Sequence, residues 1–207
     1  MYQIIDCEQR SDEWFKARLG KWTASFFDKA ITTTGKRSAS ADETNNRLVA
    51  ELFIGRPDET FQSDAMLRGS ELEDEALSFI NFTHGYNFKR VGFIDSGLGY
   101  GCSPDGDDQE QDIGLEMKIP SLHTHLTYLA GKELPKTYKA QVQGSMMITG
   151  RKKWVFMSYH PEVKPFVIIV ERDDEYINEM KKIIEACCID VRTKLSDLEK
   201  ILSEEAS

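Results

Sequence analysis

The segment from Cys102 to Lys118, CSPDGDDQEQDIGLEMK, holds the residues whose types and spacing could do chemistry. Asp105 lies in the stretch Ser-Pro-Asp-Gly, where proline at the second position and glycine at the fourth favour a type I turn. Glu116 and Lys118 flank Met117 in an apolar, strand-like run, and strand side chains alternate between faces, so the acid and the lysine share one face. If the flanking strands pair as a hairpin, Asp105 and Glu116 converge.

These side chains suit the hydrolysis of a phosphodiester. Two convergent carboxylates are hard oxygen ligands for Mg²⁺, which keeps positions open for water and for a substrate phosphate oxygen. Such a metal acts as a Lewis acid and lowers the pKa of its bound water from about 15.7 toward about 7. Lys118 adds a positive charge that stabilises a phosphate or the attacking hydroxide. Two acids and a lysine are therefore a minimal set for a metal-dependent nuclease.

A calcium-binding loop is an alternative for the same segment. Counted from Asp105 as position 1, acids occupy positions 1 and 3, Gln109 occupies position 5 and Glu116 occupies position 12, as in an EF-hand. Glu110 stands at position 6, where the EF-hand needs glycine, and Asp112 replaces the apolar residue at position 8. Both flanks are strand-like, so the segment departs from an EF-hand where its geometry is strict.

Hydrophobic periodicity predicts helices on both sides of this segment. Ser11, followed by two acids, is a good N-cap for a short helix that ends at Gly20, and Thr23 opens a second helix. The polar stretch from Thr32 to Ala41 is predicted to be a mobile loop. The remaining predicted helices cover residues 42–53, 63–82, 137–149 and 175–202, the last through an apolar stripe at three- and four-residue spacing.

Strand-like runs begin after Gly85 and surround the segment with the acids. They are rich in Val, Ile, Phe and Tyr and comprise RVGFID, GYGCS, IGLEMKI, KWVFMSYH and FVIIVERD. The helix over 137–149 lies between the third and fourth runs, as expected for a crossover that joins strands. We therefore predict a single domain over residues 1–207 with an α/β fold, a mixed central β-sheet flanked by helices.

Composition narrows the classes of protein. The chain has 207 residues, of which 40% are hydrophobic and 29% charged, which is ordinary for a globular protein and too apolar for disorder. A net charge of −9 argues against a protein that coats nucleic acid non-specifically, but it leaves room for a local basic groove. No signal-peptide pattern or membrane-spanning run is present, so we expect a cytoplasmic protein with no membrane partner. The cysteines, Cys7, Cys102, Cys187 and Cys188, lack CxxC spacing and are expected to be reduced and mostly buried.

Further sequence blocks accompany the acids in a fixed order: WFKARLGKWTAS, GSELEDEA, CSPDG, LEMK, AQVQGSM and IVERDDEYI. Together with Pro104-Asp105 and the Glu-x-Lys of Glu116 to Lys118, they span nearly the whole chain. On these blocks the sequence resembles the lambda-exonuclease family, the viral-recombinase branch of the PD-(D/E)XK nuclease superfamily. The resemblance implies a restriction-endonuclease-like core.

The same resemblance implies roles for the residues of the central segment. Asp105 and Glu116 would hold the catalytic metal or metals, with the Met117 carbonyl as a further ligand. Lys118 would orient or activate the attacking water. Glu73, in GSELEDEA, matches the family acid that the preceding helix contributes to bind a second metal or its water.

Other residues gain roles from the resemblance as well. Gln141, in AQVQ, matches an active-site glutamine that helps to position the lysine and the water. Arg18, Thr23, Ser25 and Ser103 match the pocket for the 5′ phosphate at a DNA end. A guanidinium beside hydroxyls at a helix start is suited to a phosphate, although the residues alone leave ordinary capping by Thr23 and a surface arginine open.

Several conspicuous residues are given other interpretations. Asp95 aligns with a family acid but can simply end a strand. The basic cluster GRKKW over residues 150–154 marks either a DNA entry point or a solvated turn. Structural roles are expected of the aromatic residues Trp14, Phe15 and Trp22 in the core, and of His123 and His125 as surface or hydrogen-bonding side chains.

The resemblance implies a Mg²⁺-dependent exonuclease, with Mn²⁺ able to substitute, that acts on linear double-stranded DNA with a 5′-phosphorylated end. It would degrade the 5′-ended strand in the 5′ to 3′ direction and leave a 3′ single strand. Family members form a homotrimeric ring and work with a single-strand annealing protein in phage recombination. The residues leave three alternatives open: a catalytically silent DNA-end binder or scaffold for the annealing protein, a calcium-binding module, and a site-specific endonuclease.

Overall fold

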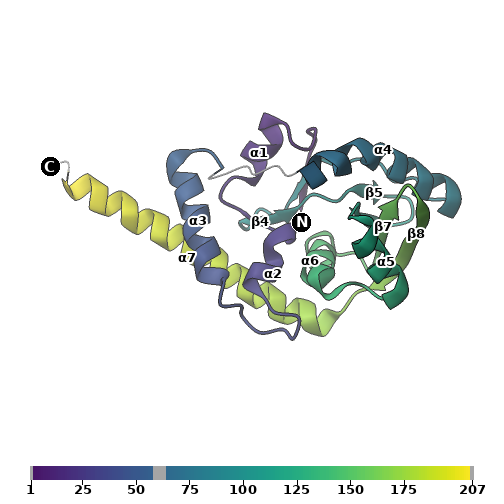
Figure 1. The fold of residues 1–207 in the computed structure, drawn as a ribbon. Coiled ribbons are helices and arrows are strands. Elements are labelled where there is room, and N and C mark those ends of the chain that lie inside the picture. The colour runs from purple at the N-terminus through teal and green to yellow at the C-terminus, as the bar shows by residue number, and fades with distance from the viewer. Residues whose placement is uncertain (1, 58–63, 206–207) are drawn as a thin grey trace.

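The computed structural model describes the backbone of residues 2–57 and 64–205, with the side chains of residues 2–57 and 72–204. Within these ranges, seven α-helices accompany two four-stranded mixed sheets (Figure 1). The predicted α/β fold is confirmed, and its strands divide over two sheets. Residue 63, the predicted start of one helix, lies outside the described residues.

The first sheet has the order β1-β3-β4-β2. β1 and β2 were not predicted because three and two residues are too short to show an alternating pattern. β2 runs parallel to β4, whereas the other pairs are antiparallel. The strands are β1 (Gln3–Ile5), β2 (Trp22–Thr23), β3 (Phe93–Asp95) and β4 (Tyr100–Cys102).

The second sheet has the order β5-β6-β7-β8 and carries the segment with the acids. β5 and β6 form an antiparallel hairpin, and β6 runs parallel to β7. β6 and β7 are buried along almost their whole length, as is usual for central strands that are covered on both faces. The strands are β5 (Gly106–Asp108), β6 (Ile113–Lys118), β7 (Lys153–His160) and β8 (Val163–Glu171).

The helices cover the sheets and confirm most of the predicted elements. The main difference lies after Thr23, where one predicted helix is replaced by strand β2, a 3₁₀ turn (Ala24–Phe26) and the short helix α2. α5 was not predicted. The helices are α1 (Asp12–Arg18), α2 (Phe27–Ala30), α3 (Ala41–Ile54), α4 (Asp64–His84), α5 (Leu122–Gly131), α6 (Lys139–Thr149) and α7 (Asp174–Glu205), with a second 3₁₀ turn at Lys136–Tyr138.

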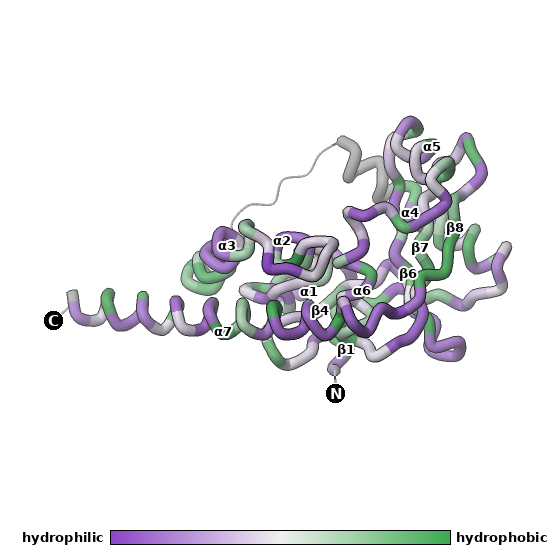
Figure 2. The backbone as a smooth tube through the Cα atoms, turned by 90° about the horizontal axis from the view of Figure 1, so that it is seen from below, coloured by the Kyte–Doolittle hydropathy of each residue, from purple (hydrophilic) through white to green (hydrophobic). Residues whose placement is uncertain are grey.

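Helix α6 lies at the centre of the molecule and α7 runs along its side (Figure 1). Gly144 of α6 lets the helix approach α2 closely, because a Cβ there would lie 2.4 Å from Phe27 Cδ2. α7 packs on α2, α3 and α6 through a buried apolar stripe, and its last turns extend beyond the body of the protein. Figure 2 shows apolar and polar residues alternating along this extension, where Leu198 and Ile201 are exposed.

The cysteines agree with the expectation of reduced and mostly buried thiols. Cys102, Cys187 and Cys188 are buried, Cys7 is partly buried, and all are free thiols. Among the described helices, none combines the length and the apolar composition needed to cross a membrane.

Candidate active site

Asp105 and Glu116 converge at the start of the β5–β6 hairpin, as predicted. The hairpin register pairs Gly106 with Leu115, which places Asp105 beside the second half of β6. The Asp105 N–H donates to the Leu115 carbonyl at 3.0 Å, and Asp105 Oδ2 accepts from the Met117 N–H at 2.6 Å. The backbone of β6 therefore fixes both the main chain and the side chain of Asp105.

Glu116, Lys118 and Gln141 form a polar cluster on the face of β6 that carries Asp105. Lys118 Nζ lies 2.6 Å from Glu116 Oε1, and Gln141 Nε2 donates to the same oxygen at 2.7 Å. Glu116 is 2% exposed, so its carboxylate depends on these two donors for solvation. Met117 points to the other face and packs in the apolar core, as strand alternation predicts.

The electrostatics of the cluster follow from two carboxylates in a partly desolvated site. Burial, followed by the negative charge of Glu116, raises the pKa of Asp105 from 3.8 to about 7. Burial alone would lower the pKa of Lys118, but the adjacent Glu116 and Asp105 carboxylates outweigh it and raise that pKa. Lys118 is therefore protonated in the metal-free site, where its positive charge offsets part of the repulsion between the two carboxylates.

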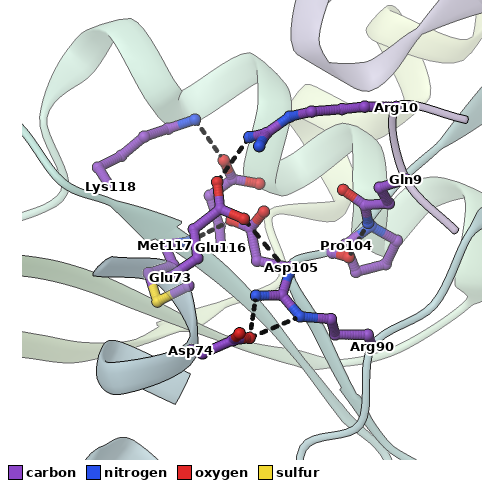
Figure 3. Close-up of polar contacts among 10 residues, drawn as sticks. All are labelled: Gln9, Arg10, Glu73, Asp74, Arg90, Pro104, Asp105, Glu116, Met117 and Lys118. Atoms are coloured by element: carbon purple, nitrogen blue, oxygen red, sulfur yellow. Dashed lines mark hydrogen bonds and ion pairs between the residues drawn. The ribbon is translucent and has the colours of Figure 1, made fainter. Parts of the chain in front are cut away.

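Glu73 on α4 faces the same site and is held by two arginines (Figure 3). Arg10 Nη2 lies 2.6 Å from Glu73 Oε1, and Arg90 Nη1 lies 3.3 Å from Glu73 Oε2. The charge of Glu73 also contributes to the raised pKa of Asp105. Arg10 has a φ of 72°, a left-handed conformation that costs a residue with a Cβ about 1–2 kcal/mol.

Gln9 ties the N-terminal segment to the chain that leads into Asp105. Its Nε2 donates to the Val91 carbonyl at 2.7 Å and to the Pro104 carbonyl at 2.8 Å. Gln9 thus supports the residue directly before the acid. No signal in the sequence identifies it, because its partners lie 82 and 95 positions away along the chain.

The donor set fits a hard divalent cation that retains water. In the part of the chain with described side chains, no group of three or more His, Cys, Asp and Glu side chains is arranged to hold an ion. Mg²⁺, however, commonly uses one or two carboxylates together with waters and substrate phosphate oxygens. Asp105, Glu116 and the Met117 carbonyl offer that kind of set, and a cation would offset the burial and the Glu116 charge that together raise the pKa of Asp105.

The four residues predicted to bind a terminal phosphate lie together. Arg18 Nη1 donates to Ser103 Oγ at 3.1 Å and Arg18 Nη2 donates to Thr23 Oγ1 at 3.3 Å. Thr23 Oγ1 and Ser25 Oγ are 3.0 Å apart. The helix after Thr23 is too short to provide a strong dipole, and Thr23 makes no capping hydrogen bond, so the positive character of this pocket comes from Arg18.

Arg18 is an unusual cation because its hydrogen-bond partners are hydroxyls rather than carboxylates. Burial lowers the pKa of its guanidinium to about 10, which leaves it charged at neutral pH. Trp14 lies beneath it, with its ring centroid 3.9 Å from Arg18 Cζ, and donates its Nε1–H to Ser103 Oγ at 2.9 Å. Trp14 was expected in the core, but it shapes this pocket instead.

The structure corrects the interpretation of Arg151 in the basic cluster GRKKW, whereas Lys152 and Lys153 are exposed. Arg151 is 4% exposed and forms a short ion pair with Asp107 and a second, 3.2 Å pair with Asp112. The positive charge of Arg151 is therefore neutralised by acids of the hairpin and is not exposed to DNA. Lys153 pairs with Glu171 at 3.3 Å.

The acids of the alternative calcium loop also have structural partners. Asp107 is paired with Arg151, and Asp108 accepts the backbone N–H groups of Asn87, Glu110 and Gln111. These contacts explain the strand and turn at this point without a calcium ion. The EF-hand arrangement is therefore contradicted, because its third position is already neutralised by a buried guanidinium.

The remaining candidates have structural contacts. Asp95 forms a 2.6 Å ion pair with Lys21. His125 is buried, with Nδ1 2.8 Å from Ser158 Oγ and Nε2 3.1 Å from the Lys164 carbonyl, which confirms its expected hydrogen-bonding role. Trp22 is buried in the core as expected, and its Nε1–H donates to Asn45 Oδ1 at 2.9 Å.

Comparison with known proteins identifies the class to which this fold and site belong. Residues 13–152 match the YqaJ-like viral recombinase domain, and the chain belongs to this family. The resemblance seen in the sequence is thereby confirmed. No curated protein matches the chain.

Two solved exonucleases are similar to the chain as a whole. The alkaline exonuclease LHK-Exo from Laribacter hongkongensis is 29% identical, with a TM-score of 0.84 over 94% of this chain and 99% of that one. The same values apply to its complex with dAMP. A phage related exonuclease from Haemophilus somnus 129PT shares the fold, with a TM-score of 0.69 and 16% identity over 86% of this chain and 96% of that one.

Proposed function

We propose that this protein is a metal-dependent exonuclease that degrades the 5′-ended strand of linear double-stranded DNA in the 5′ to 3′ direction. The product would be a 3′ single-stranded overhang for phage-type recombination by strand annealing. One observation carries the proposal: Asp105, Glu116 and Lys118 meet in one polar cluster in a chain that is 29% identical to an alkaline exonuclease. The dAMP complex of that relative supports a DNA nucleotide as the product.

The metal site would consist of Asp105, Glu116 and the Met117 carbonyl, with Glu73 as ligand to a second ion or its water. Mg²⁺ suits these oxygen donors, and Mn²⁺ would substitute for it. When bound, the ion supplies a Lewis acid for the phosphate and lowers the pKa of its water. Gln141 keeps Glu116 oriented by donating to Oε1.

Lys118 would orient the attacking water and stabilise negative charge at the cut phosphate. The two carboxylates raise its pKa, so Lys118 is positively charged before a metal binds. A fixed cation at this point favours the more negative transition state over the bound substrate.

The Arg18 pocket would bind the 5′ phosphate of the DNA end and so set the polarity of digestion. A fork-shaped guanidinium with three hydroxyls nearby can satisfy several phosphate oxygens at once. Binding there would also supply the counter-charge that Arg18 lacks among its hydrogen-bond partners. A 5′-hydroxyl end would bring no such counter-charge into the pocket.

Two partners complete the proposal. A homotrimeric ring would enclose the duplex and keep the enzyme on it, and a single-strand annealing protein would coat the exposed 3′ strand. The mass of the protein in solution tests the first, and co-elution with an annealing protein tests the second.

The test of function uses a duplex with one 5′-phosphorylated and one 5′-hydroxyl end, each strand carrying a different label, with Mg²⁺ or Mn²⁺ present. Rapid loss of the 5′-phosphorylated strand, absent in Lys118→Ala, is the expected result. Binding without digestion would favour the silent DNA-end binder. Cutting of a closed circular duplex would show an endonuclease, and digestion from the 3′ ends would refute the assigned polarity.

A further inference from the structure

Arg10 approaches the candidate active site from the N-terminal segment, on a different side of Glu73 from Arg90 (Figure 3). Its side chain is 48% exposed, whereas that of Glu73 is 22% exposed. The ion pair between them is therefore accessible to a ligand that enters the site.

The backbone directs Arg10 toward this position. Its φ of 72° is unfavourable for a residue with a Cβ, and the two neighbouring residues hold it there. Gln9 is bound to the Val91 and Pro104 carbonyls, and Ser11 caps α1 by accepting the Trp14 N–H. The chain on both sides of Arg10 therefore places its side chain at the candidate active site.

Arg90 also holds Glu73 and is itself anchored to Asp74. Its Nη2 and Nε lie 2.7 and 3.2 Å from Asp74 Oδ1, in addition to the contact of Nη1 with Glu73. Glu73 therefore keeps a neighbouring cation if Arg10 moves away. Arg10 can exchange its partner without leaving the carboxylate of Glu73 unpaired.

We propose that Arg10 is an exchangeable phosphate contact, which pairs with Glu73 in the free protein and moves to a backbone phosphate of the DNA when substrate binds. This inference rests on the proposed function of the site. A guanidinium binds phosphate through the same two-pronged geometry as carboxylate, and a half-exposed one needs little further desolvation. The exchange frees one oxygen of Glu73 to face a metal ion, so DNA and metal promote each other's binding.

The first test measures the salt dependence of DNA binding. Arg10→Gln removes the charge and keeps the unfavourable backbone, and Arg10→Gly removes both. Each is made in a Lys118→Ala background and titrated with a labelled 5′-phosphorylated duplex in Mg²⁺ at several salt concentrations. Lys182→Gln on α7 is the matched control, because its ion pair with Glu179 is also 2.6 Å long and exposed.

Both Arg10 variants should lower the slope of log Kd against log salt by about 1, as expected for one lost phosphate contact. The control should keep the slope of the parent. An unchanged slope in the Arg10 variants, or no DNA binding by the parent, overturns the proposal. A wild-type protein that binds DNA without cutting it contradicts the proposed function and leaves this test intact.

The second test measures metal affinity without DNA. Calorimetric titration with Mn²⁺ should give several-fold tighter binding to Arg10→Gln and Arg10→Gly than to the wild type, because a cation that competes for Glu73 has been removed. Unchanged or weaker binding would mean that Arg10 holds Glu73 in place for the metal, and this result overturns the exchange.

Discussion

Asp105→Asn should stabilise the metal-free protein while abolishing its proposed activity. The change removes a charge that burial and Glu116 disfavour and keeps an oxygen that can accept the Met117 N–H. The pKa of Asp105 is raised from 3.8 to about 7. At about 1.4 kcal/mol per pKa unit, ionising this group in the folded protein costs up to about 4 kcal/mol. Because the side chain is only partly buried and solvent screens part of this cost, we expect a gain of about 1–2 kcal/mol, or about 2–8 °C in Tm.

The gain should depend on pH in a defined direction. The pKa of Asp105 is higher in the folded protein than in the unfolded chain. Below pH 3.8 the carboxyl is protonated in both states, so its burial costs the wild type least; as the pH rises to about 7 the wild type loses free energy of unfolding, because only the unfolded chain ionises readily. Asparagine does not titrate. The advantage of Asp105→Asn should therefore be largest near pH 8 and shrink steadily as the pH falls toward 4.

Thermal unfolding in EDTA at several pH values measures this difference. Asp197→Asn on α7 serves as the control, because Asp197 is exposed and pairs only loosely with Lys200 at 3.3 Å. Excess Mg²⁺ should stabilise the wild type and not Asp105→Asn, so the difference in Tm between the two proteins should narrow or reverse. The electrostatic explanation is refuted if Asp105→Asn has a lower Tm than the wild type in EDTA at pH 8. It is also refuted if the gain in Tm is the same at pH 4 as at pH 8.

Three further changes have definite expected outcomes. Arg18→Lys should reduce the preference for a 5′-phosphorylated end about tenfold in a competition digest, because lysine cannot reach Ser103 and Thr23 as a fork. Gln9→Ala removes the hydrogen-bond donor of the Val91 and Pro104 carbonyls, so it should lower the free energy of unfolding by about 1–3 kcal/mol. Because Gln9 supports the residue before Asp105, the same change should lower kcat more than it lowers DNA affinity. Gly144→Ala should destabilise the protein by about 1–3 kcal/mol in the same assay, because the new Cβ would lie 2.4 Å from Phe27; an unchanged Tm would mean that α2 and α6 separate easily.

The sequence was sufficient for the part of the site that depends on local geometry. Strand alternation predicted that Glu116 and Lys118 share a face, and a hairpin between the flanking strands was expected to bring Asp105 toward Glu116. The same holds for most helices, whose apolar stripes are long. These features depend on the side-chain periodicity of strands and helices and on the residue preferences of turns, which can be read from the sequence.

The missed features depend on contacts between distant segments. Arg151 lies in a run of basic residues that is typical of a surface. Only the folded chain shows that Asp107, 44 residues away, is its ion-pair partner. Strand β5 consists of Gly106, Asp107 and Asp108, which are poor strand formers, and it exists because β6 supplies its hydrogen bonds. Arg10 gave no signal, because its proximity to Glu73 spans 63 residues.

The short link between the two sheets fixes the distance between the Arg18 pocket and Asp105. Ser103, Pro104 and Asp105 connect β4 to β5, and each is held by a separate partner: Arg18 and Trp14, Gln9, and the N–H of Met117. Two residues of extended chain span at most about 7 Å, so the pocket for the DNA end and the carboxylate at the cut are kept a short, constant distance apart. Under the proposed function, the length of the released fragment is therefore set by the protein backbone and does not depend on the DNA sequence.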